Sequence, residues 1–162
     1  MVEVSHIKPF LESVESLYDT MLDSKIKAGK VSYFKSSDFR QDDLTMVISI
    51  AGEIKTTTMA ITFPKPTAIS LVGALLGMPV EEDDSGTIVD GLGEVSNIVG
   101  GGAKAKFQQE GVPMDLSLPH FLRGPQDEIL KFTSNTQWID IPFQSDLGNF
   151  SMRVCTYKNG KS

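Results

Sequence analysis

Two polar residues form the pair in this sequence with the clearest chemical potential. Glu94 and Asn97 lie three positions apart within GEVSNIVGGGAK, the stretch from Gly93 to Lys104. Residues three apart on a helix are neighbours on its surface, so a carboxylate and a carboxamide project there together. The sequence thus predicts one carboxylate and one carboxamide on a single helix face.

The helix around this pair is rich in residues that weaken helices. Asn favours caps over helix interiors, and glycines stand at positions 91, 93, 100, 101 and 102. Each glycine costs up to about 1 kcal/mol relative to Ala in a helix interior. Close packing on a sheet would explain the glycines at 91 and 102, but not those at 93, 100 and 101, which fall on or beside the polar face. Two explanations stay open: tight packing, and a surface on which another macromolecule docks.

Other catalytic motifs do not occur in the sequence. The segment Gly100–Lys104 lacks the spacing of a phosphate-binding loop, and neither GxGxxG nor GxSxG is present. The two histidines, His6 and His120, lie in different segments without the spacing of metal ligands. Cys155 alternates with strand residues and is expected to pack in a core, whereas Trp138 is expected to pack in or beside the sheet. We expect this chain to bind no metal and no cofactor.

The composition is that of an ordinary globular domain with an acidic balance. Of 162 residues, 40% are apolar and 22% charged, and 15 Lys and Arg oppose 21 Asp and Glu, for a net charge of −6. This balance argues against a general nucleic-acid binder, which needs cations to displace counterions from phosphates, and against binding to an anionic membrane surface. A single cysteine excludes an internal disulfide. The start does not resemble a leader, and no run of about 18 apolar residues occurs, so we expect a cytoplasmic protein with one domain over residues 1–162.

The longest patterned stretch predicts a helix over residues 84–110. An acidic segment, residues 81–85, precedes it and suits the positive end of the helix dipole, and Gly111 and Pro113 end it. At about 100° per residue, one side is mostly apolar and expected to face the core: Ile88, Leu92, Val95, Val99, Gly102 and Ala103. The opposite side is mostly polar: Asp90, Glu94, Asn97, Gly101, Lys104 and Gln108.

The remaining elements predict an α+β fold. Apolar residues between Ile7 and Leu22 recur every three or four positions, which is typical of a helix, and a short helix is expected from Thr67, its cap, to Leu76. Strands are expected at 31–35, 44–50, 54–63, 114–118, 130–141 and 150–157, the second and third as a hairpin. This order predicts a mostly antiparallel sheet of about six strands, with the long helix and two further helices packed on it.

The glycine-rich helix resembles that of a known signalling family. The signature of the CheC/CheX/FliM chemotaxis phosphatases is Glu-x-x-Asn, and Glu94 and Asn97 fill its two positions. The resemblance extends over most of the chain: the N-terminal helix, the hairpin, Phe63-Pro64, Leu75-Leu76-Gly77 at the end of the short helix, and Ser117-Leu118-Pro119. CheC-type relatives carry two such helices, whereas the short helix here, residues 67–76, has no Glu or Asn. The chain is therefore more similar to the CheX branch.

The resemblance implies an enzyme that hydrolyses the aspartyl phosphate of a phosphorylated CheY-like response regulator, in chemotaxis or another two-component circuit. It implies that Asn97 enters the regulator's active site and positions the attacking water, as a Gln does in small GTPases. It implies that Glu94 pairs with the lysine of the regulator's phosphate site, and that Mg²⁺ belongs to the regulator. Further residues around the pair are expected to contact the partner: Asp90, Gly93, Gly100, Gly101 and Lys104.

The sequence leaves alternatives open for the dimer interface and for the catalytic activity. The resemblance implies a homodimer formed through sheet edges, either by the C-terminal strand, residues 150–157, or by another unprotected edge. The alternative function is a non-catalytic module of the same fold, which binds a regulator without hydrolysis as flagellar switch relatives do. A third possibility is a helix-on-sheet domain whose glycines only permit tight packing, and burial of Glu94 and Asn97 would favour it.

Overall fold

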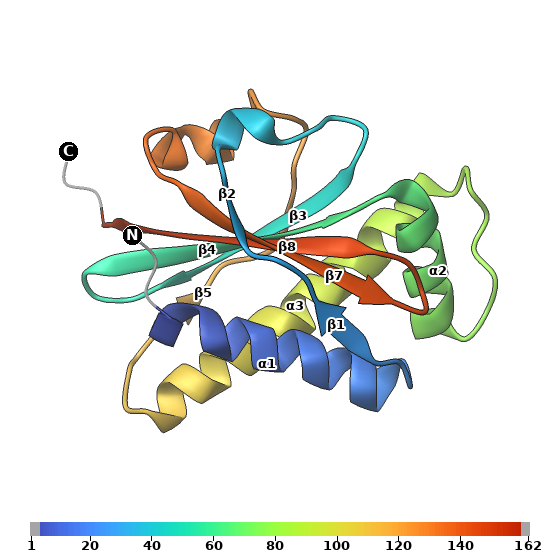
Figure 1. Cartoon of the computed structure of the whole chain (residues 1–162), viewed down its shortest axis with the longest axis horizontal. Coiled ribbons are helices and arrows are strands. Elements are labelled where there is room, and N and C mark those ends of the chain that lie inside the picture. Colours follow the sequence, from blue (N-terminus) through green and yellow to red (C-terminus); the bar gives the residue numbers. More distant parts are fainter. Residues whose placement is uncertain (1–3, 160–162) are drawn as a thin grey trace.

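A twisted antiparallel sheet runs through the middle of the molecule, and helices cover one of its faces (Figure 1). The computed structural model describes residues 4–159, with side chains from residue 6 onward. Its helices are α1 (Val4–Met21), α2 (Lys65–Leu76) and α3 (Ser85–Gln109), with short 3-10 helices η1 (Ser36–Asp38) and η2 (Glu128–Thr133). Its strands are β1 (Ile26–Ala28), β2 (Ser32–Phe34), β3 (Leu44–Ala51), β4 (Lys55–Phe63), β5 (Asp115–Leu116), β6 (His120–Phe121), β7 (Trp138–Ser145) and β8 (Phe150–Lys158). None of the helices in this described range is both long and apolar enough to span a membrane.

The strands are all paired antiparallel. Their order is β1-β7-β8-β4-β3-β5, with β2 also pairing with β7, and β6 also pairing with β3. The β3–β4 hairpin closes where Ala51 faces Thr56, and the Gly52 N–H donates to the Lys55 carbonyl at 2.8 Å. The predicted α+β class with an antiparallel sheet is confirmed. Within residues 4–159 the sheet has eight strands rather than about six. The expected segments 31–35 and 114–118 contain β2 and β5, whereas β1 and β6 were not expected, because strands of three and two residues are too short to show an alternating pattern.

The face of the sheet under the helices carries the main core. Alternate residues of the long strands point toward α1, α2 and α3, as the two-residue period of a strand requires. From the strands this core takes Met46, Ile48, Ile50, Met59, Ile61, Phe63, Ile141, Phe143, Phe150, Met152 and Val154. From α3 it takes Ile88, Leu92, Val95, Val99 and Ala103. The side of the long helix that was expected to be apolar therefore faces the core.

The opposite face of the sheet carries a second, smaller core. Trp138 is fully buried there, donates from Nε1 to the Ser36 hydroxyl at 3.0 Å, and meets Phe39 edge-on at 5.2 Å between ring centroids. Cys155 lies in the same cluster, where burial raises the pKa of its thiol. The expected packing of Cys155 in a core and of Trp138 in the sheet is confirmed. The short helices η1 and η2 lie on this side of the sheet (Figure 1).

Two observed elements differ from the predicted ones. Residues 130–141 do not form one strand, because η2 occupies the first part of this range and β7 begins only at Trp138. Helix α2 begins at Lys65, two residues before the expected cap. Thr67 instead donates its hydroxyl to the Asn149 carbonyl at 3.0 Å, which ties α2 to the turn between β7 and β8.

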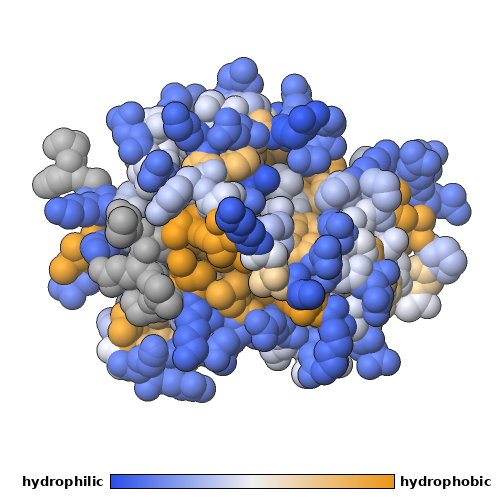
Figure 2. Space-filling model, in the orientation of Figure 1, coloured by the Kyte–Doolittle hydropathy of each residue, from blue (hydrophilic) through white to orange (hydrophobic). Residues whose placement is uncertain are grey.

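Short strands form both edges of the sheet. β1 and β2 border β7 at one edge, and β5 and β6 border β3 at the other. β8, which contains residues 150–157, lies between β4 and β7 with both sides paired, so the prediction that it could offer a free edge to a dimer is wrong. β1 and β2 lie toward the viewer in Figure 1, and Figure 2 shows an apolar area near the middle of this largely hydrophilic face.

Candidate functional site

The ends of α3 are set by its own sequence. Asp84 caps the N-terminus, because its carboxylate accepts from the Thr87 hydroxyl at 2.7 Å and from the Thr87 N–H at 3.2 Å. These hydrogen bonds lower the pKa of Asp84. After the last turn, Gly111 takes a φ of +77°, a left-handed conformation that glycine adopts without strain. Helix α3 therefore continues without a break through the glycines at positions 91, 93, 100, 101 and 102.

Two of the glycines allow close packing on α2 and on the sheet. A Cβ on Gly91 would lie 2.6 Å from the Val72 side chain of α2. A Cβ on Gly100 would lie 3.0 Å from Ile48 of β3 and equally close to Leu116 of β5. The packing explanation therefore holds for Gly91, as expected. It also holds for Gly100, which is buried, so the prediction that Gly100 lies on or beside the exposed face as a partner contact is wrong.

A third glycine, Gly102, lies where α3 crosses α1. A Cβ there would collide with the side chain of Ser13, whose hydroxyl donates to the Val99 carbonyl at 2.7 Å. Helix α3 thus packs on α1, on α2 and on the sheet, and its buried sector is wider than one side of a helical wheel. This wide buried sector explains why the wheel placed Gly100 incorrectly.

The remaining sector of α3 is open to solvent. Glu94 and Asn97 are both exposed, so the pair is not buried in the domain's own core. The sector is called here the Glu94/Asn97 face, and its residues are Asp90, Gly93, Glu94, Asn97, Gly101 and Lys104. Asp90 is exposed like the central pair, and the other three lie half-buried.

Two glycines on this face are not required by packing. A Cβ on Gly101 would have no heavy atom within 4 Å, and one on Gly93 would meet only the terminal methyl of Met46 at 3.8 Å. These glycines lie four residues before and after Asn97, where side chains would stand next to it on the helix surface. The Asn97 carboxamide therefore has no side chain beside it at these positions, and a partner can approach it and the helix backbone.

The side chains of the central pair are available to a partner. The side chains of Glu94 and Asn97 make no hydrogen bond or ion pair with the residues that the structure describes. The face carries the carboxylates of Asp90 and Glu94 against the ammonium of Lys104, so its charges favour an approaching cation. A carboxamide can donate to and accept from a water molecule. Residues 4–159 contain no group of three or more His, Cys, Asp and Glu side chains placed to hold a metal ion.

The family of the chain follows from a match that includes this face. Residues 44–144 match the profile of the family described as chemotaxis phosphatase CheX, and this range contains the whole of α3. The chain belongs to the CheX family. No curated protein matches it significantly.

Solved structures of CheX-like proteins share the fold over nearly the full chain. A CheC-like superfamily protein from Shewanella sp. PV-4 is 25% identical with a TM-score of 0.77, over 96% of this chain and 99% of that one. The chemotaxis protein CheX from Desulfovibrio desulfuricans is 25% identical with a TM-score of 0.75, over 95% and 100%. The CheX of Borrelia burgdorferi, crystallised with CheY, BeF3 and Mg²⁺, has a TM-score of 0.74 at 21% identity, over 95% and 99%, and shares the fold.

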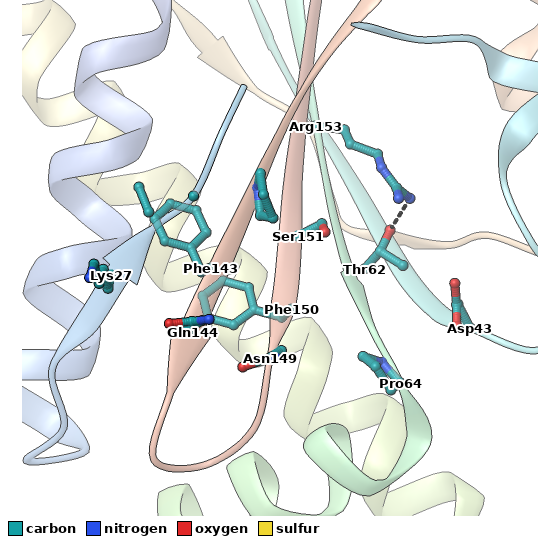
Figure 3. Close-up of a pocket in the computed structure, with 13 residues that line it drawn as sticks. Lys27, Asp43, Thr62, Pro64, Phe143, Gln144, Asn149, Phe150, Ser151 and Arg153 are labelled. Carbon is teal, nitrogen blue, oxygen red and sulfur yellow. Dashed lines mark hydrogen bonds between the residues drawn. The ribbon is translucent and has the colours of Figure 1, made fainter. Parts of the chain in front are cut away.

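Away from α3, this CheX-family chain has a hollow of about 460 Å³ between β1 and the ends of β4 and β8 (Figure 3). Arg153 lines it and donates to Asp140 at 2.7 Å and to the Thr62 hydroxyl at 3.1 Å. The guanidinium is thus engaged by residues of the chain itself. None of the predicted site residues lines this hollow, and it does not contribute to the Glu94/Asn97 face.

One interacting pair had no signal in the sequence. His120 Nε2 lies 2.9 Å from the carboxylate of Asp127, which also accepts from the backbone N–H groups of Arg123 and Ile129. Burial acts to raise the pKa of Asp127, but these hydrogen bonds outweigh it and lower the pKa to about 2. The pair holds the loop that leads to η2, whose residues pack in the second core, so its role is structural.

Proposed function

We propose that this CheX-family protein hydrolyses the aspartyl phosphate of a phosphorylated CheY-like response regulator. The observation that carries the proposal is an exposed carboxamide, Asn97, in the middle of a well-packed helix, with Gly93 and Gly101 on either side and Glu94 three residues away. Membership of a family of chemotaxis phosphatases supports it. An enzyme whose substrate is the active site of another protein needs its own reactive groups on the outside.

Asn97 holds the attacking water in this proposal. Phosphoryl transfer depends mainly on positioning and charge stabilisation, and the water must stand in line with the bond between phosphorus and the aspartate oxygen. The carboxamide oxygen accepts from this water, and the amide NH2 can donate to it. The water oxygen bonds to phosphorus, the aspartate leaves as a carboxylate, and inorganic phosphate is released. Gly93 and Gly101 leave room for α3 to enter the regulator's phosphorylation site.

Glu94 aligns α3 on the regulator in the same proposal. Its carboxylate pairs with the lysine of the regulator's phosphate site through a charge-assisted contact. Asp90, four residues earlier, and Lys104, near the other end of the face, are further partner contacts. The magnesium ion comes with the regulator; the complex of the Borrelia burgdorferi CheX, which contains CheY, BeF3 and Mg²⁺, supports this partner and this metal.

Phosphate release from a panel of phosphorylated response regulators tests the proposal. The wild-type protein is expected to accelerate phosphate loss from its cognate regulator, and Asn97→Ala to abolish the acceleration while binding stays nearly intact. Glu94→Ala is expected to weaken binding. An Asn97→Ala protein with the wild-type rate would refute the assignment. A wild-type protein that binds a regulator without accelerating phosphate loss would support the non-catalytic module of the same fold.

A cytoplasmic homodimer, joined at the β1–β2 edge of the sheet, is the assembly we propose. Among the residues that the structure describes, β2 pairs with β7 alone, and Val31 and Tyr33 at this edge are exposed. Unprotected strand edges of this kind can pair with a second copy. Sedimentation equilibrium is expected to give twice the monomer mass for the wild type and the monomer mass for Tyr33→Lys. A monomeric wild type would contradict the proposed dimer.

A further inference from the structure

The sheet edge formed by β5 and β6 contains a bulge. Both strands pair with β3, and between them two residues, Leu118 and Pro119, stand opposite the single residue Ile48. A bulge of this kind bends the edge and redirects a side chain, and Pro119 is tolerated because an edge strand need not donate at that position. Leu118 is 86% exposed, more than the other large apolar side chains in the described part of the chain.

Hydrogen bonds on both sides fix the bulge in place. The Ser117 N–H donates to the Ser49 carbonyl at 2.8 Å, and the Ser117 hydroxyl accepts from the Ser49 N–H at 2.9 Å. The same hydroxyl lies 3.1 Å from the Leu118 carbonyl and donates to it. Beyond the bulge, the Leu122 N–H donates to the Thr45 carbonyl at 2.9 Å. The backbone therefore holds an apolar side chain in water, where it contributes nothing to the core.

The bulge passes alongside the middle of α3. Gly100 packs on Leu116, just before the bulge, and Gly93 faces Met46, which pairs with β6 just after it. Gly93 and Gly100 are about 10 Å apart along the axis of α3, at 1.5 Å per residue, and Asn97 lies between them. Helix α3 contacts both β5 and β6, and Figure 1 shows β5 beside α3. Leu118 is therefore level with Asn97, at the border of the Glu94/Asn97 face.

We propose that Leu118 is an apolar anchor for the receiver domain of the response regulator, beside the polar pair. This inference rests on the proposed function. The bulge lies beside the Glu94/Asn97 face, so a receiver domain that takes Asn97 into its phosphorylation site is placed to cover Leu118 as well. The regulator is therefore favoured as occupant over a second copy of this chain. Its matching surface is an apolar side chain next to the phosphorylation site.

The anchor and the polar pair have separate effects on the reaction. Removing a leucine side chain from water adds affinity without direction, and a few buried anchors carry most of the energy of an interface. Leu118 touches no reacting atom, so its loss weakens binding and leaves the rate of the bound complex unchanged. Asn97 acts in the opposite way, on rate rather than on affinity.

The test compares Leu118→Ser with a matched control, Ile54→Ser. Ile54 is 68% exposed in the turn between β3 and β4, so the control also removes an aliphatic side chain from the surface. Calorimetry measures the Kd for the cognate regulator activated with BeF3 and Mg²⁺. Leu118→Ser is expected to raise this Kd about tenfold or more, with an unchanged rate at saturation, melting temperature and oligomeric mass. Ile54→Ser is expected to match the wild type in all four.

The outcomes separate this inference from the function on which it rests. A Leu118→Ser protein that binds the regulator as tightly as the wild type overturns the inference and leaves the proposed function intact. A wild-type protein that binds none of the activated regulators overturns both. A lower oligomeric mass for Leu118→Ser also overturns the inference, because the bulge would then hold a second copy of the chain.

Discussion

Glu94 and Asn97 have separate tasks because a carboxylate and a carboxamide interact differently with a partner. The carboxamide is neutral and both donates and accepts, so it can orient a water molecule. The carboxylate is charged and only accepts, so its contact with a cation weakens as salt screens it. Both side chains are exposed. Substitutions at either position are therefore expected to leave the stability of the fold nearly unchanged.

Replacing Glu94 with glutamine is expected to weaken binding in a salt-dependent way. Loss of a charge-assisted contact predicts a Kd for the BeF3-activated regulator about tenfold higher at low ionic strength. The difference from wild type is expected to shrink in high salt, where the screening length falls to about 3 Å at 1 M. Glu15→Gln, at an exposed carboxylate on α1, is the matched control. Equal Kd values for Glu94→Gln and wild type across the salt series would contradict the pairing with a lysine.

The carboxylate of Asp127 gives the fold a definite acid dependence. Its pKa is about 2 in the folded protein, against about 3.9 in an unfolded chain. A lowered folded-state pKa stabilises the fold above about pH 4, and the contribution is lost as the pH falls toward about 2. Asp127→Asn is expected to lower the free energy of unfolding by about 1–2 kcal/mol near neutral pH. As the pH falls from about 4 to about 2, the free energy of unfolding of the variant is expected to fall less than that of the wild type. Urea unfolding at several pH values measures both differences. Equal decreases for the variant and the wild type over this range would contradict a lowered pKa of Asp127 in the folded protein.

At the scale of the elements, regular patterns could be predicted and contacts between elements could not. The period of 3.6 residues was enough to place the core side of α3. The close packing that explains Gly102 and Gly100 depends on Ser13 of α1 and Leu116 of β5, which lie in other elements. Strand β5 lies within the segment 114–118 that was expected to be a strand, whereas β6, with two residues, carries no alternation and was not expected. The exposure of Glu94 and Asn97 was predicted correctly. The position of Leu118 beside them could not be predicted, because it depends on how β5 and β6 pair with β3.

Two adjacent glycines of α3 are expected to respond oppositely to alanine. Gly101→Ala adds a methyl group in open space and is expected to raise the free energy of unfolding by up to about 1 kcal/mol through helix propensity. Gly102→Ala is expected to lower it by about 1–3 kcal/mol, because the Cβ collides with Ser13. Urea unfolding measures both changes.

The same pair of variants separates packing from docking. Gly101→Ala is expected to slow dephosphorylation of the regulator although it makes the fold more stable, because the added methyl group lies next to Asn97. A more stable Gly101→Ala protein with wild-type affinity and rate would remove Gly101 from the docking surface.

At the scale of the whole molecule, the sheet supports one exposed sector of α3 from behind. β4 and β8 contribute to both cores, for example through Met59 and Ala60 and through Val154 and Cys155. Helix α3 is in turn held by α1, α2 and this sheet. A helix that is packed on several sides presents Asn97 in a nearly fixed place, which is what the positioning of a water molecule requires.

The shared strands predict that both cores unfold together. Trp138, the one tryptophan of the sequence, reports on the second core through its fluorescence, and far-ultraviolet circular dichroism reports mainly on the helices over the main core. Both signals are expected to give the same midpoint in urea, as a cooperative unit does. Two separate transitions would contradict this prediction, and with it the proposal that residues 1–162 form one domain.

The role of Asn97 is tested by the rate of phosphate loss from the cognate regulator at a saturating concentration of the Asn97→Ala protein. Saturation is set from the affinity of the variant for the BeF3-activated regulator, so a slow rate cannot come from weak binding. If Asn97 positions the water, the variant keeps nearly wild-type affinity and the rate falls to that of the regulator alone. A saturated Asn97→Ala complex that loses phosphate at the wild-type rate would contradict the claim that Asn97 positions the water.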